Sequence, residues 1–188
     1  MLDEYRIKAY AEKAAAIAHS FLGLDCPYSV ALIDKPGIAE DALLDTQQNE
    51  IRINLALLKP FSAEEMPIAE PRTEEEREQM ENYRHMMKIN YLVFHEMRHL
   101  YQKKTVEAYM INQTLGGKLV PQPESDKKCQ LWLEGLKDGA GEVEEDANDF
   151  AYYLTNRYPI HRPMVQKGRR LAAMKRKYDK VPVPGANE

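Results

Sequence analysis

Residues 91–102 read YLVFHEMRHLYQ, and this stretch determines how the rest of the chain is interpreted. It contains the pattern H-E-x-x-H, formed by His95, Glu96 and His99. Residues four apart lie one turn apart on the same face of a helix, so both imidazoles can point at one position in space. A zinc ion binds two such nitrogens at about 2.0–2.1 Å and has room for further ligands. The stretch therefore predicts a helix that carries two metal ligands.

Glu96 follows His95 directly and therefore lies beside the metal-facing side of this helix. From there it is badly placed to bind the same ion but well placed to accept a proton from a water molecule on it. Residues 89–94 are mostly apolar, which predicts that the helix is buried. Buried histidines and acids need polar partners, and a metal ion provides one for all three residues. The alternative is a pair of core histidines that are satisfied without a metal.

Periodicity, capping residues and turn residues predict the remaining elements. The expected helices are 3–22, ended by Gly23, then 73–104, 125–137, 142–155 and a basic helix ending near 178. The expected strands are 28–33, 42–45 and 50–54, and the last two form a hairpin. Thr73 and Glu76 form the capping-box pattern that starts the long helix. The elements predict an α+β fold, mainly helical, with a small antiparallel or mixed sheet of about three strands.

The 188 residues are enough for one domain with its own core, which we expect to span residues 1–180. Residues 59–72 are expected to be a loop because they contain three prolines, and 105–138 are expected to be an insertion. This insertion either lines or covers the metal site, or merely connects the two parts of the site. Residues 181–188 are expected to be a disordered tail.

Charge and composition narrow the classes of partner and compartment. No run of 18 or more apolar residues is present, so we expect no contact with a membrane. Residues 157–180 carry nine Lys or Arg and one acid in a chain of net charge −4. Because aromatic residues do not interleave with these charges and no nucleic-acid motif is present, this segment is expected to be a solvated basic helix rather than a nucleic-acid contact. Cys26 and Cys129 are expected to be reduced thiols of a cytoplasmic protein, and the oligomeric state is not predicted.

A catalytic zinc ion takes three protein ligands and keeps one position open. The third ligand is expected in the acid-rich start of the helix at 142–155. Its candidates are Glu142, Glu144, Glu145, Asp146 and Asp149. The alternative for these acids is compensation of the helix dipole.

The two motifs together resemble the ImmA/IrrE-type metallopeptidases, members of the gluzincin group. The matching residues after HEMRH are Glu144, Asp146, Ala147, Asn148, Phe150 and Ala151. The resemblance implies a zincin-like domain, Glu144 as the third zinc ligand, and Asn148 as the group that holds a ligand histidine. Glu145 with Asp149 is the rival assignment at the same spacing. Arg98 stands where that family commonly has a small residue.

The expected function is therefore a zinc-dependent metallopeptidase, a hydrolase whose substrate is a protein or peptide. Glu96 is its expected general base, and strand 51–54, if it lies at an edge, can hold an extended substrate. An oxyanion donor is expected among Tyr101, Tyr109, Tyr152 and Tyr153. The resemblance suggests a cytoplasmic regulatory protease of phage or mobile-element type. The alternative is a zinc-stabilised binding module without turnover, for which Cys129 is the candidate fourth ligand.

Overall fold

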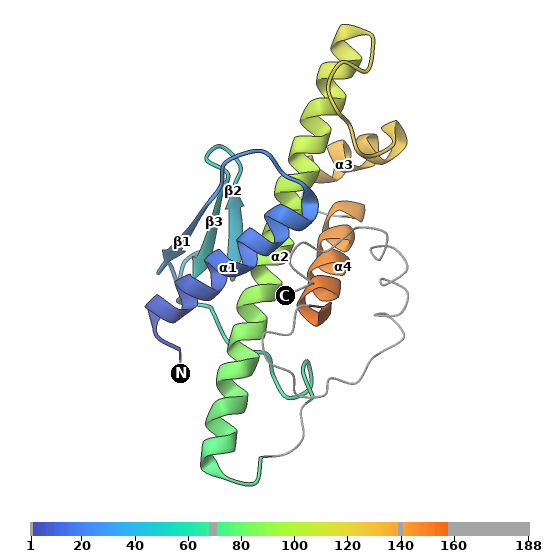
Figure 1. The fold of residues 1–188 in the computed structure, drawn as a ribbon. Helices are drawn as coiled ribbons and strands as arrows, with labels where there is room; N and C mark the ends of the chain where they lie inside the picture. Colours follow the sequence, from blue (N-terminus) through green and yellow to red (C-terminus); the bar gives the residue numbers. More distant parts are fainter. Residues whose placement is uncertain (1, 68–70, 139–140, 158–188) are drawn as a thin grey trace.

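The computed structural model describes residues 2–67, 71–138 and 141–157 (Figure 1). It contains, in chain order, α1 (Glu4–Leu22), β1 (Ser29–Ile33), β2 (Ala42–Asp45), β3 (Glu50–Asn54), α2 (Glu74–Leu115), α3 (Asp126–Asp138) and α4 (Glu142–Arg157). The predicted α+β class is confirmed, since the described residues are mainly helical around a three-stranded mixed sheet. The predicted basic helix beyond residue 157 and the tail at 181–188 lie outside the described residues.

Helix α2 is the long central element, and the sheet and α4 lie on opposite sides of it (Figure 1). The predicted N-cap is confirmed, because the Thr73 hydroxyl accepts a hydrogen bond from the backbone N–H of Glu76 at 3.1 Å. The predicted end at Lys104 is wrong. The helix continues to Leu115 because no glycine or proline interrupts it before Gly116, which ends it with a left-handed φ of 68°. Its 42 residues give a rod roughly 63 Å long at 1.5 Å per residue.

Helix α1 packs across α2 through a face of small residues (Figure 1). Four alanines on this face are fully buried, namely Ala11, Ala14, Ala15 and Ala18. Small side chains let the two helix axes approach closely, so α1 supplies one wall of the main core. The predicted stop is confirmed, because Gly23 caps the helix with φ 62°.

The sheet has the strand order β1-β3-β2. The predicted hairpin is confirmed, since β2 and β3 pair antiparallel with Leu44 opposite Ile51. Strand 51–54 could hold a substrate only if it lay at an edge, and this condition is not met because β1 pairs parallel with its other side. β3 is therefore central, and its Ile51 and Ile53 are fully buried. The strand at the edge of the sheet beside α2 is β2.

Helix α4 packs along α2 through an apolar stripe. Five residues of this stripe are buried, namely Val143, Ala147, Phe150, Ala151 and Leu154. Helix α3 confirms the short helix expected there, and its Trp132 is buried with Val106 of α2 and Val143 of α4. The helices of the described part of the chain include none that is both long and apolar enough to cross a membrane.

The close packing of α1 against α2 yields a stability prediction. Ala15→Leu adds volume at a fully buried contact and should lower the free energy of unfolding by about 1–3 kcal/mol. Ala16→Leu, at the neighbouring exposed position of the same helix, should change it by less than about 0.5 kcal/mol. Urea unfolding of both variants checks this, and equal effects would show that α1 does not pack through this face.

Candidate metal centre

The two histidines of the motif meet at one point beside α2. Burial of neighbouring residues on this helix, such as Phe94, Met97 and Leu100, fixes the direction in which His95 and His99 point. Their Nε2 atoms lie 2.9 Å apart, and their rings meet edge to face at a centroid distance of 4.5 Å. Only 15% and 13% of the two side chains are exposed. The spacing in the sequence therefore produces the convergence that was predicted.

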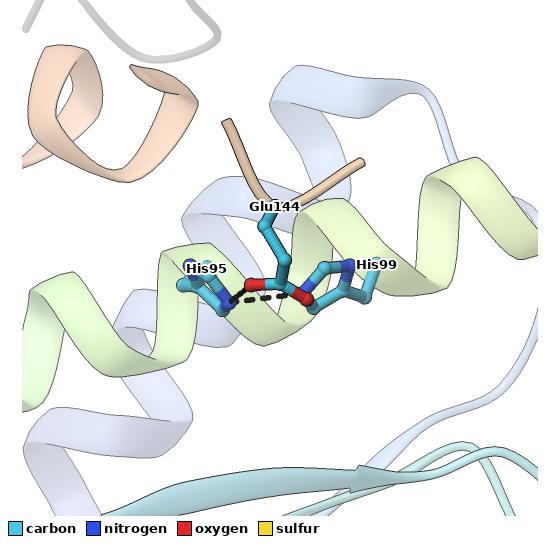
Figure 2. A group of neighbouring side chains, drawn as sticks. All are labelled: His95, His99 and Glu144. Atoms are coloured by element: carbon cyan, nitrogen blue, oxygen red, sulfur yellow. Dashed lines mark hydrogen bonds and ion pairs between the residues drawn. The ribbon is translucent and has the colours of Figure 1, made fainter. Parts of the chain in front are cut away.

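Helix α4 brings Glu144 onto the same point. Its carboxylate lies between the two imidazoles, with Oε2 at 3.3 Å from Nε2 of His95 and Oε1 at 3.2 Å from Nε2 of His99 (Figure 2). Ligands of a tetrahedral cation with bonds of about 2.0–2.1 Å lie roughly 3.3 Å from one another. The three ligand atoms therefore already have nearly the separations that such an ion requires, and the cluster can hold a metal ion.

The other acids considered as the third ligand lie elsewhere. Glu145 is exposed, and it is not part of the three-residue cluster found among the described residues. The buried Asp146 forms an ion pair with Arg98, whose Nε donates a hydrogen bond to Asp146 Oδ2 at 2.6 Å. Asp149 is likewise outside the cluster. The geometry thus favours Glu144 over the rival pair.

The Nδ1 atoms of His95 and His99, which face away from the metal position, have different surroundings. Nδ1 of His99 lies 2.8 Å from Oε1 of Gln102. The buried Nδ1 of His95 has no hydrogen-bond partner of standard geometry. Asn148 interacts with the His95 side chain and accepts a hydrogen bond from the Tyr91 hydroxyl at 2.7 Å. Asn148 thus lies next to one of the two histidines, and its role in holding a ligand histidine stays a prediction.

Burial and mutual repulsion keep His95 neutral, which is the form that binds a metal. Desolvation, followed by the charge of His99, lowers the pKa of His95 to about 4, and the interaction with Asn148 offsets part of this shift. A neutral imidazole has a free lone pair for a cation. His95 can therefore bind a metal without first losing a proton at neutral pH.

Glu96 lies in a different electrostatic environment from Glu144. Only 7% of it is exposed, and it lines the same cavity as the histidines. Burial, followed by the nearby charge of Glu144, raises the pKa of Glu96 to about 8, and a hydrogen bond from the backbone N–H of Leu44 opposes the shift. In the metal-free protein Glu96 is therefore protonated at neutral pH, and a bound cation would favour the carboxylate form that can accept a proton.

A cavity of about 460 Å³ surrounds these groups. One wall is the edge strand β2, with Leu43 and Leu44, and the opposite wall includes the start of α4. Gly135 and Leu136 at the end of α3 also line it. The segment 105–138 therefore does line the site, which was one of the two interpretations of this insertion.

Sequence reasoning missed the polar groups that support the site. Lys103 follows His99 by one helical turn and holds the β2–β3 turn through the carbonyl oxygen of Thr46 and Oδ1 of Asn49. Helical spacing alone could have placed these residues near the site, because positions three and four residues after His99 lie on the same side of the helix. Their partners were not predictable, since they come from distant parts of the chain.

The tyrosines proposed as oxyanion donors do not reach the cavity. None of Tyr101, Tyr109, Tyr152 and Tyr153 is among its lining residues. Tyr101 instead packs against Trp132 and has a pKa raised by burial to about 12. The ring centroid of another tyrosine, Tyr91, lies 6.4 Å from that of His95. Cys129 is fully buried and does not belong to the metal cluster described above.

The raised pKa of Glu96 predicts how the stability of the metal-free protein depends on pH. Glu96 retains its proton in the folded state up to about pH 8, whereas the unfolded chain loses it near pH 4.5. The folded state therefore binds more protons in this window, and the free energy of unfolding should fall as pH rises through it. Glu96→Gln should remove this decrease, as measured by urea unfolding of chelator-treated protein. Parallel pH profiles for the two proteins would contradict the burial of an acid here.

Comparisons of the chain with protein-family models, curated proteins and solved structures found no match. The function proposed below therefore depends on the residues of the site itself.

Proposed function

We propose that this protein is a zinc-dependent metallopeptidase in which His95, His99 and Glu144 bind the ion and Glu96 is the general base. The observation that carries the proposal is the convergence of three ligand atoms next to a buried acid in one cavity. Two imidazoles and a carboxylate form the ligand set of many hydrolytic zinc sites. The resemblance of both motifs to ImmA/IrrE-type enzymes supports the same conclusion.

The donor atoms favour zinc over the other common cations. Calcium and magnesium bind almost entirely through oxygen, whereas this cluster offers two imidazole nitrogens and one carboxylate. Nitrogen and oxygen donors in a tetrahedral arrangement suit zinc, and cells supply it widely. With three protein ligands, one coordination position remains for water or substrate, as in catalytic zinc sites.

Glu96 distinguishes a catalytic site from a structural one. Bound zinc would act as a Lewis acid and lower the pKa of water to about 7. Glu96 then accepts a proton from the attacking water and passes it to the leaving amine when the peptide bond breaks. A structural zinc site is usually closed by a fourth ligand and needs no such acid, so the buried Glu96 supports catalysis.

The free edge of β2 supports an extended peptide as substrate. β2 is paired on one side only, and the backbone N–H of Leu44 points to Glu96 instead of to β3. Its unpaired edge therefore faces the metal site, where a peptide can add as a further strand. The resemblance favours a cytoplasmic regulatory protease of phage or mobile-element type.

A zinc-stabilised binding module without turnover is the second candidate. It is favoured by one observation, namely that none of the four tyrosines expected to stabilise an oxyanion lines the cavity. In this case the ion would hold α2 and α4 together, and the cavity would bind a partner without cleaving it. The two candidates share the metal site and differ in whether Glu96 transfers a proton.

Metal content tests what both candidates share. Purified protein should bind about one zinc ion per chain, and His95→Ala should weaken zinc binding by at least tenfold because it removes a ligand. His19→Ala is the matched control, because His19 lies on α1 and bonds to the Cys26 carbonyl oxygen. Mass spectrometry of the metal and a chelator competition measure this. A wild type that takes up no zinc would contradict the proposal.

Cleavage tests the catalytic role of Glu96. Glu96→Gln should retain zinc but lower peptide hydrolysis by about 10²–10⁴-fold, because the amide cannot accept the proton. Glu145→Gln, which changes an exposed acid next to Glu144, should retain both zinc and activity. Activity is measured on a broad library of quenched fluorescent peptides. Zinc binding by a wild type that cleaves none of them would favour the binding module.

A further inference from the structure

We propose that Gln102 is a positioning residue of the metal site, and that the buried pair Arg98–Asp146 holds it in place. We call these three residues the Gln102 bridge. The bridge fixes which ring nitrogen of His99 carries the proton and ties α2 to α4 beside the ligands. The inference rests on the proposed metal site, since its purpose is to prepare His99 for a cation.

The orientation of the Gln102 side chain is fixed by its own hydrogen bonds. Gln102 is fully buried, and its Nε2 donates to Asp146 Oδ2 and to the Val143 carbonyl oxygen, both at 3.0 Å. A flipped amide would place its oxygen against these two acceptors and leave them unpaired. The amide oxygen must therefore face His99.

This orientation selects one tautomer of His99. Oε1 of Gln102 can only accept a hydrogen bond, so Nδ1 of His99 carries the proton and donates to it over 2.8 Å. Nε2 is then unprotonated and points at Nε2 of His95 and the carboxylate of Glu144. A metal-binding histidine uses its second nitrogen in this way to orient its ring and strengthen its lone pair.

Arg98 holds the carboxylate of Asp146 in place as the acceptor for Gln102. Its Nε and Nη2 bind the two carboxylate oxygens at 2.6 and 3.2 Å, although only 4% of Arg98 is exposed. The guanidinium also lies over the rings of Tyr101 and Phe150, at 4.5 and 5.4 Å from their centroids. An arginine remains charged in such surroundings and binds a carboxylate with two parallel bonds.

The members of the bridge come from positions next to the ligands. Arg98 precedes His99 on α2, and Asp146 follows Glu144 by two residues on α4. The bridge therefore joins the two helices directly beside the ligands, with Gln102 in contact with His99. It sets the register in which Glu144 reaches the imidazoles, so its loss should affect metal affinity more than overall folding.

Gln102→Met tests the bridge in the full-length protein. Methionine keeps the unbranched shape of the side chain but cannot accept the Nδ1–H bond. Zinc affinity, measured by competition with a chromophoric chelator, should fall by about 10–100-fold. Met87→Leu, a volume-conserving change at a buried position of the same helix away from the ligands, should leave it within about threefold.

Nitrogen NMR of the His99 ring provides a measurement that a purely structural role would not change. Zinc-free wild type should show the Nδ1–H tautomer, and Gln102→Met should show both tautomers. An Nε2–H tautomer in the wild type overturns the inference even if the variant does not fold. Unchanged zinc affinity and tautomer in a folded Gln102→Met protein also overturn it. A wild type that binds no zinc contradicts the proposed function instead, and the tautomer then still decides whether the bridge exists.

Discussion

The register of α4 against α2 is the constraint on which the rest of the structure depends. His95 and His99 meet on one helix without help, but the third ligand comes from a helix more than forty residues later in the chain. A shift of α4 by one residue would turn Glu144 away and bring a neighbouring side chain towards the histidines. Buried apolar contacts from Phe150 and Leu154 hold the two helices together, and the Arg98–Asp146 pair gives the contact a single register.

Burial has opposite effects on adjacent groups of the site, and both effects suit a metal centre. It lowers the pKa of His95 to about 4, which leaves a free lone pair, and it raises the pKa of Glu96 to about 8. A cation placed between the ligands would favour the charged form of nearby carboxylates. The same low-dielectric surroundings therefore prepare one residue to bind a metal and the other to exchange a proton.

Local features of the sequence predicted most of the fold. The sequence predicted the capping residue Thr73, the glycine stop at Gly23 and the hairpin at 42–54, because each depends on neighbours within a few residues. The sequence predicted the convergence of His95 and His99 for the same reason, because the two residues lie one helical turn apart. The parallel pairing of β1 with β3 could not be predicted in this way, because β2 lies between these two strands in the chain. The ion pair between Arg98 and Asp146 was also not predictable, because a sequence alone does not distinguish a buried pair of charges from two exposed ones.

Anomalous diffraction at the zinc edge, on crystals of the zinc-loaded protein, tests the central claim most directly. The account predicts one strong peak bonded to Nε2 of His95, Nε2 of His99 and a carboxylate oxygen of Glu144, at about 2.0–2.2 Å from each. A peak bonded to Glu145 or Asp149, or no peak between the two histidines, would contradict it.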